Sequence, residues 1–269
     1  VWYKINALWN NISELLPQIY LYNPAQCCRK ALEKSMALST VLEENIQYIE
    51  SVLPIGSSFD LMTRRLYLGK TGAYFLGING FCKTDILQQI FSDLQNPMYV
   101  ENGCVEDIVQ YMNGKIGYAQ TSLSDTWHDI IRNLLSGPSV LMIDGFAQAI
   151  LIDVRTYPAR GIAEPDLERV TKGSRDGFVE TLLFNANLIR RRVRSADLCF
   201  AMHSVGTASK TDVAVAYLEG SVNHELLEKL SHTLSSLQAT SLTMGAKSLE
   251  ELLLHKRWWN PLPSILMTE

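Results

Sequence analysis

The feature of this sequence that most restricts its fold is a strand-turn-strand-helix pattern that occurs twice. The first copy has apolar runs at 59–68 and 73–78 around Gly69-Lys70-Thr71-Gly72, and the second has apolar runs at 197–205 and 212–218 around a polar turn. A stripe of apolar residues at helical spacing follows each hairpin: Ile86, Leu87, Ile90 and Leu94 in the first copy, and Leu226, Leu227, Leu230 and Leu234 in the second. Gly80 and Gly220 hold corresponding positions, 140 residues apart. The pattern predicts an α/β (α+β) fold with two similarly built subdomains, each a small mixed sheet with packed helices.

Further elements are predicted between and around these two copies. Asp144-Gly145, between apolar runs at 140–143 and 146–154, is a strong hairpin signal. Apolar residues at helical spacing predict helices at 26–52, 105–112, 123–135 and 178–193, and a capping box at Ser248 predicts a last helix to about residue 257. The predicted organisation is an N-terminal arm (1–39), a first subdomain (40–155), a second subdomain (156–259) and a junction segment (260–269).

The composition excludes several classes of protein. With 47% hydrophobic residues and a net charge of −4, the chain of 269 residues has too much apolar surface and too little charge for a disordered protein. The acidic balance also argues against binding to nucleic acid. The longest apolar stretch, 140–154, is cut by Asp144 and Asp153, and is shorter than the roughly 18 apolar residues that a membrane helix needs. The five cysteines lack zinc-binding spacing, so we expect reduced thiols in a cytosol-facing protein.

No motif for catalysis or for a cofactor stands out. Gly69-Lys70-Thr71 lacks the glycine that a phosphate-binding loop requires five residues earlier, where Arg64 stands, so we interpret it as a hairpin turn. The five histidines have no metal-binding spacing, although a site built from dispersed ligands stays open. Asp144, Asp153 and Glu164 could form a carboxylate set, but the two aspartates lie at predicted strand ends, where acids commonly end a hairpin. We expect no enzymatic activity, no cofactor and no metal.

The segment 155–194 is unusually dense in charged and polar residues. On a helix, Glu180, Asn187, Arg191 and Arg194 fall within one stripe, opposite Phe178. Such a stripe could dock an acidic partner segment or lie against anionic lipid headgroups. The alternative is a solvated face with local ion pairs that contribute about 0–1 kcal/mol each.

The same segment, together with Asp144-Gly-Phe before it, carries an ordered series of motifs. The series runs Asp144-Gly-Phe, Arg155, Pro158-Ala-Arg160-Gly-Ile-Ala-Glu164-Pro165, Gly173-Ser-Arg175-Asp-Gly-Phe178-Val-Glu180 and Asn187-Leu-Ile-Arg190-Arg191-Arg192. Supporting stretches are Gly56-Ser-Ser-Phe59-Asp60, Asn79-Gly80-Phe81, Ser209-Lys-Thr-Asp212-Val and Tyr217-Leu-Glu-Gly220. This series resembles the GerA/SpoVAF spore-germination family, and the resemblance covers about residues 40 to 269.

The resemblance implies a membrane protein with a cytosol-facing head. In that family, two α/β subdomains precede a bundle of transmembrane helices, and the junction usually carries Asn-Pro-x-Pro, which Asn260-Pro261-Leu262-Pro263 matches here. We therefore expect a C-terminal membrane region beyond this sequence. Family members are A-type subunits of nutrient germinant receptors, or a related sporulation protein, in the spore inner membrane. They act with a transporter-like subunit and a lipoprotein in germinant sensing and ion release.

These considerations predict a non-enzymatic head that forms homo-oligomers and transmits or stabilises an assembly state. The candidate interaction or inter-subdomain network comprises Arg160, Glu164, Arg175, Glu180, Asn187, Arg190 and Arg191. A buried pair of Glu180 with an arginine could equally be structural only, because buried charges must be paired wherever they occur. The alternative hypothesis is a ligand-binding module that holds a small anion against the arginines in an inter-subdomain cleft.

Overall fold

The computed structural model describes residues 2–4, 36–95, 105, 107–115, 120–156, 177–237, 249 and 266–268. The chain divides into two compact units. The sheet unit comprises Ala25–Ala159 and Leu183–Phe200, and the hairpin unit comprises Val1–Pro24, Arg160–Leu182 and Ala201–Glu269. The predicted organisation in four consecutive segments stays a prediction. Residues 183–200 belong to the sheet unit, and the chain continues into the hairpin unit at both ends of this segment.

The sheet unit is built on a five-stranded sheet in the order β2-β3-β5-β6-β4, and every pairing within it is antiparallel. The strands are β2 (Leu61–Leu68), β3 (Thr71–Ile78), β4 (Gln120–Ser124), β5 (Ser139–Ile143) and β6 (Ala149–Asp153). Both predicted hairpins, β2-β3 and β5-β6, are confirmed. Gly69 at φ +64° and Gly145 at φ +88° take the left-handed backbone conformation that their turns need.

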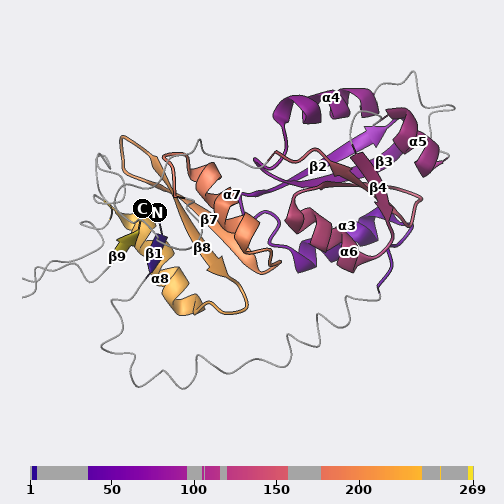
Figure 1. The fold of residues 1–269 in the computed structure, drawn as a ribbon. Helices are drawn as coiled ribbons and strands as arrows, with labels where there is room; N and C mark the ends of the chain where they lie inside the picture. The colour runs from indigo at the N-terminus through magenta and orange to yellow at the C-terminus, as the bar shows by residue number, and fades with distance from the viewer. Residues whose placement is uncertain are drawn as a thin grey trace, which may run out of the picture. The chain divides into compact units, whose positions relative to one another are not determined.

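Helices cover both faces of this sheet, which gives three layers (Figure 1). On one face, α4 (Thr84–Gln95) and α5 (Ile108–Lys115) pack on alternate strand residues such as Phe75 and Leu141. On the other face, α3 (Leu42–Val52) and α6 (Trp127–Ser136) pack on residues such as Leu76 and Val140. Because side chains alternate along a strand, two covered faces require the near-continuous apolar runs of β3, β5 and β6.

Several predicted helices have other boundaries in the structure. The helix predicted at 105–112 spans Ile108–Lys115, and the helix predicted at 178–193 spans Leu182–Arg192. The helix predicted at 123–135 begins only at Trp127. Residues 120–124, for which no strand was predicted, form β4, an edge strand whose partly polar sequence gives little alternation. The helix predicted from residue 26 begins at Leu42 within the described residues. Its start is fixed by a distant group, because the backbone N–H of Leu42 donates to Asp144 Oδ1 at 3.0 Å.

The hairpin unit contains the second copy of the repeated pattern. β7 (Leu198–Val205), whose first residues belong to the sheet unit, pairs with β8 (Thr211–Leu218), and α8 (His224–Ser236) follows. Val205 and Leu234 form a small core there, with Val213, Val215 and Leu230 packed against them. A separate antiparallel pair joins β1 (Trp2–Lys4) and β9 (Leu266–Thr268). Apart from Leu249, the helix predicted at 248–257 lies outside the described residues.

With helix α7 (Leu182–Arg192), six helices lie among the described residues. Their combination with antiparallel sheets confirms the predicted α+β class. Within the described ranges, no helix combines the length and the hydropathy that crossing a bilayer requires.

Candidate functional site

The described part of the charged segment centres on α7, in which some polar side chains are buried while Arg192 is exposed. Asn187 and Arg190 are each 1% exposed. On the neighbouring stripe of the helix, Ala186 and Ile189 pack with Phe59, Leu198 and Phe200. At Asn187, the predicted polar stripe is therefore neither a solvated face nor a docking face, and Arg190 beside it is equally enclosed.

Arg190 is held by three hydrogen bonds and one aromatic ring. Its Nε donates to Asp60 Oδ2 at 2.7 Å, and its Nη1 and Nη2 donate to the carbonyls of Ser195 and Leu198, each at 2.8 Å. The guanidinium carbon lies 5.4 Å from the centre of the Phe200 ring. Arg190 thus binds the turn between α7 and β7 to the start of β2. Removing one partner of such a buried pair commonly costs about 3–5 kcal/mol.

Asp60, 0% exposed, is fixed from the other side of this pair. The Ser58 hydroxyl donates to Asp60 Oδ1 and accepts from the backbone N–H of Phe200 at 2.9 Å. The backbone carbonyl of Asp60 accepts from the N–H of Asn79 at 2.7 Å, at the far end of the β2-β3 hairpin. The carboxylate therefore has two defined partners, as a buried charge requires.

Asn187 sits against the turn between β3 and α4. Gly80 in this turn has φ +82°, and a Cβ added there would lie 2.3 Å from Asn187 Nδ2 and 3.2 Å from a methyl of Leu183. No side chain larger than hydrogen fits at residue 80 in this arrangement. We call the set Ser58, Asp60, Gly80, Asn187 and Arg190 the α7 junction.

One member of the α7 junction lacks partners. Neither Oδ1 nor Nδ2 of Asn187 has a hydrogen-bond partner among the described residues. A buried amide left without partners costs about 1–3 kcal/mol. Other buried polar groups, such as Asn45, do have partners: its side-chain nitrogen donates to the Ser39 carbonyl at 2.7 Å. The α7 junction thus combines an arginine that is hydrogen-bonded through all three of its nitrogens with an amide that has no partner among the described residues, one helical turn away.

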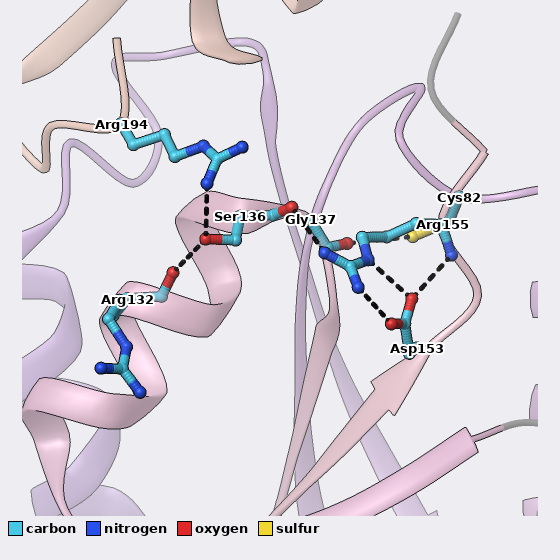
Figure 2. Close-up of polar contacts among 7 residues, drawn as sticks. All are labelled: Cys82, Arg132, Ser136, Gly137, Asp153, Arg155 and Arg194. Atoms are coloured by element: carbon cyan, nitrogen blue, oxygen red, sulfur yellow. Dashed lines mark hydrogen bonds and ion pairs between the residues drawn. The ribbon is translucent and has the colours of Figure 1, made fainter. Parts of the chain in front are cut away.

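A second polar cluster lies at the C-terminal end of α6 and is centred on Ser136 (Figure 2). Arg155 Nη1 donates to the Ser136 carbonyl and Arg194 Nη1 to the Ser136 hydroxyl, each at 3.4 Å, and this hydroxyl donates to the Arg132 carbonyl at 2.8 Å. The segments that follow β6 and α7 therefore both donate a hydrogen bond to the C-terminal end of α6. Positive side chains are favourable there because the last carbonyls of a helix carry partial negative charge.

Arg155 is oriented by an acid and by a glycine. Its guanidinium donates through Nε to Asp153 Oδ1 at 2.8 Å and through Nη2 to the other carboxylate oxygen. These bonds lower the pKa of Asp153 below its ordinary value of 3.8. Gly137 ends α6 at φ +116°, where an added Cβ would lie 2.7 Å from Arg155 Cδ. We call Arg132, Ser136, Gly137, Asp153 and Arg155, with Arg194, the Ser136 cluster.

Several reactive or acidic side chains near these two clusters have structural surroundings. Burial raises the pKa of Cys82, which lies 3.2 Å from the Ser139 hydroxyl and carries an inert thiol rather than a thiolate at neutral pH. Asp144 and Asp153 lie at opposite ends of the β5-β6 hairpin, where Asp144 caps α3 and Asp153 pairs with Arg155. Within the described residues, no group of three or more His, Cys, Asp or Glu side chains is arranged to hold a metal ion.

The structure brings together only part of the predicted network. Asn187 and Arg190 are buried in the α7 junction, Arg191 is half-buried and Glu180 is exposed. The buried acid that pairs with an arginine is Asp60 rather than Glu180. Arg160, Glu164 and Arg175 lie outside the described residues.

Sequence reasoning missed Asp60, Ser58 and Gly80 as members of the site. All three stand in the supporting stretches of the family resemblance, which is the signal in the sequence that could have found them. Pairing Asp60 with Arg190 from sequence would require knowing that residues 130 positions apart are in contact. Three of the motif stretches, at 56–60, 79–81 and 187–192, therefore meet at one buried place.

Comparisons with known proteins identify a family and several relatives of this chain. Residues 47–269 match the model of the family described as Bacillus/Clostridium GerA spore germination protein. Stage V sporulation protein AF of Bacillus subtilis (strain 168) is 32% identical over 229 residues, which cover 84% of this chain and 45% of that protein. Spore germination protein B1 of Bacillus subtilis (strain 168) is 26% identical over 238 residues, covering 87% of this chain and 48% of that protein. The chain thus spans about half the length of these relatives.

A solved structure has the same fold. The N-terminal domain of the A subunit of the Bacillus megaterium spore germinant receptor GerK3 superposes with a TM-score of 0.61 at 21% identity, over 83% of each chain. The family model covers most of the sequence, including the α7 junction and the Ser136 cluster. The chain belongs to the Bacillus/Clostridium GerA family of spore germination proteins.

Proposed function

We propose that this chain is the cytosol-facing head of a germination complex in the bacterial spore inner membrane. In this proposal the head helps to assemble the complex and transmits the signal that leads to ion release. Its partners are further copies of itself, a transporter-like subunit and a lipoprotein. Membership of the GerA family supports the proposal, as do relatives named spore germination proteins.

The observation that carries the proposal is the enclosure of the family motifs in the α7 junction. Asp60 and Arg190 have exposed fractions of 0% and 1%, so a substrate has no access to them, and their hydrogen bonds fix backbone segments instead. Residues 183–200, which contain α7, lead at both ends into the hairpin unit. A displacement of the hairpin unit would therefore pull on a helix that is anchored in the sheet unit. This arrangement suits the transmission of an assembly state and requires no catalytic step.

The test is ion release from spores exposed to nutrient germinants. Spores that lack the full-length gene should release ions more slowly than spores with the gene restored. Glu180→Ala and Arg191→Ala, in the restored gene, should impair release while the purified chain keeps its circular dichroism spectrum and melting temperature. Glu228→Ala, an exposed position on α8, is the matched control and should change neither property.

Two results would contradict the proposal in different ways. Unchanged ion release in the deletion strain would remove the link to germination. Loss of folding in both the Glu180 and Arg191 variants would assign these residues to structural stability instead of signalling.

A further inference from the structure

The starting point is the place of α7 in the chain. Residues 183–200 pack within the sheet unit, but the chain enters them from the hairpin unit and returns to it after Phe200. Arg190 fixes the C-terminal end of α7 through Asp60 and the carbonyls of Ser195 and Leu198. A helix held at one end and pulled from both ends can change its seating by pivoting about the anchored end.

Asn187 lies one turn from this anchor and contrasts with it. Arg190 uses donors on all three guanidinium nitrogens, whereas the Asn187 amide has no partner among the described residues. Buried polar groups are nearly always hydrogen-bonded, so an unbonded amide disfavours the arrangement in which it occurs. A leucine of similar size would fit the same place without that penalty.

The Asn187 amide lies against the backbone of the β3-α4 turn. Its Nδ2 faces Gly80 in the β3-α4 turn so closely that an added Cβ at residue 80 would lie 2.3 Å away. This turn is itself connected to the rest of the unit, since the Phe81 carbonyl accepts from the N–H of Thr156 at 2.7 Å. A small rotation of α7 about Arg190 would carry the amide along the peptide groups of residues 79–81.

From these contacts we infer that α7 has a second seating against the β3-α4 turn, in which the Asn187 amide is hydrogen-bonded to the backbone of that turn. The arrangement of α7 in the structure and this second seating are two states in equilibrium. The hairpin unit shifts the equilibrium by pulling on residues 182 and 201. The inference deepens the proposed function, on which its signalling part rests, and it names Asn187 as the residue that keeps both seatings accessible.

The test replaces Asn187 by leucine and compares this change with Asn185→Leu. Asn185 is the matched control because it is also buried on α7, at 8% exposed, but does make an interaction within the fold. In the purified chain, Asn187→Leu should raise the melting temperature by about 2–4 °C, since it favours the present seating, whereas Asn185→Leu should lower it. Backbone amide hydrogen exchange in 183–190 and 79–82 should become at least about tenfold slower in the Asn187 variant.

In spores, Asn187→Leu should slow ion release by at least about fivefold, because the second seating is lost. A fall in melting temperature would overturn the inference, since it would mean that the amide is bonded in the present seating, for instance to a buried water. A higher melting temperature with unchanged hydrogen exchange would also overturn it. Slower hydrogen exchange together with normal ion release would refute the signalling role of the two seatings, but not their existence. If deletion of the gene leaves ion release unchanged, the proposed function is refuted, and the hydrogen-exchange result still tests whether the two seatings exist.

Discussion

The two copies of the hairpin-helix pattern have the same local structure but different surroundings. In β3 of the first copy, the last six of eight residues are buried, whereas no residue of β8 in the second copy is buried. β3 lies inside a five-stranded sheet between two helical layers, while β8 pairs with β7 alone among the described strands. Equal local patterns therefore do not imply equal contributions to stability, because burial depends on what covers the second face.

The two hairpins also differ in how they turn. β2 and β3 are joined by Gly69 and Lys70, and Leu68 pairs with Thr71 directly across the turn. Gly69 at φ +64° in the first of two turn positions fits a type II′ turn. The second hairpin uses a longer turn, in which Gly206 has φ +97° and Lys210 has φ +45°. The shorter turn fixes the register of the buried hairpin more tightly.

The largest expected difference in stability between variants of the two copies is at the base of the first hairpin. Arg190→Met should lower the free energy of unfolding by about 3–5 kcal/mol, because it leaves Asp60 buried and unpaired. Chemical denaturation of the purified chain measures this loss. Glu219→Ala in the second copy, whose contact with His224 is exposed, should change stability by less than about 0.5 kcal/mol.

A double variant checks the cause of this loss. Asp60→Leu combined with Arg190→Met removes both charges and should be clearly more stable than the Arg190→Met variant alone. Additive losses would show that packing around Arg190, including its contact with Phe200, outweighs the charge pair.

The next largest effect compares corresponding apolar residues at the ends of the two hairpins. Ile78, 0% exposed, corresponds to Leu218, 39% exposed, by the spacing of 140 residues. Ile78→Ala should cost about 2–5 kcal/mol, since it removes buried methylenes and leaves a cavity. Leu218→Ala should cost less than about 0.5 kcal/mol. Similar losses at both positions in thermal or denaturant unfolding would mean that β8 is covered as fully as β3.

A smaller effect is expected at the two corresponding glycines. Gly80→Ala should cost at least about 1–2 kcal/mol, because residue 80 has a left-handed backbone and an added Cβ meets Asn187. Gly220→Ala, at an exposed position, should cost less than about 0.5 kcal/mol. Asn187→Ala should partly rescue Gly80→Ala in a double-mutant cycle, and strict additivity would show that the two side chains do not compete for space.

The smallest effect concerns the Ser136 cluster, which belongs to the sheet unit alone. The folded-state pKa of Asp153 is lowered by Arg155, so its contribution to stability is complete above the ordinary pKa of 3.8 and is lost as pH falls through the folded-state value. The stability difference between the native chain and Arg155→Met should therefore be constant above about pH 5 and shrink below about pH 4. Denaturant titrations across this range measure it, and a difference independent of pH would exclude the Asp153 contribution.

The sequence predicted the local elements well where one physical signal dominated. Apolar spacing marked α4, and Gly69-Lys70 and Asp144-Gly145 marked two hairpins that the structure confirms. It failed at β4, because an edge strand with the sequence Gln-Thr-Ser-Leu-Ser carries too little apolar alternation to be recognised. For the site, the resemblance drew attention to Asn187 and Arg190. A buried pair of Glu180 with an arginine was considered as a structural alternative, but the acid that meets Arg190 is Asp60.

The sequence by itself determined most of the strands and helices and the family to which the chain is similar, because periodicity, turn glycines and motif order are local properties. Only the tertiary structure decided which side of α7 faces inward and which acid meets Arg190. The reason is physical: a buried guanidinium requires a carboxylate and carbonyls at fixed positions, and Asp60, 130 residues away, reaches it only once the sheet has formed. The unbonded amide of Asn187 has the same origin, since its missing partners are a property of packing and leave no trace in the residue order.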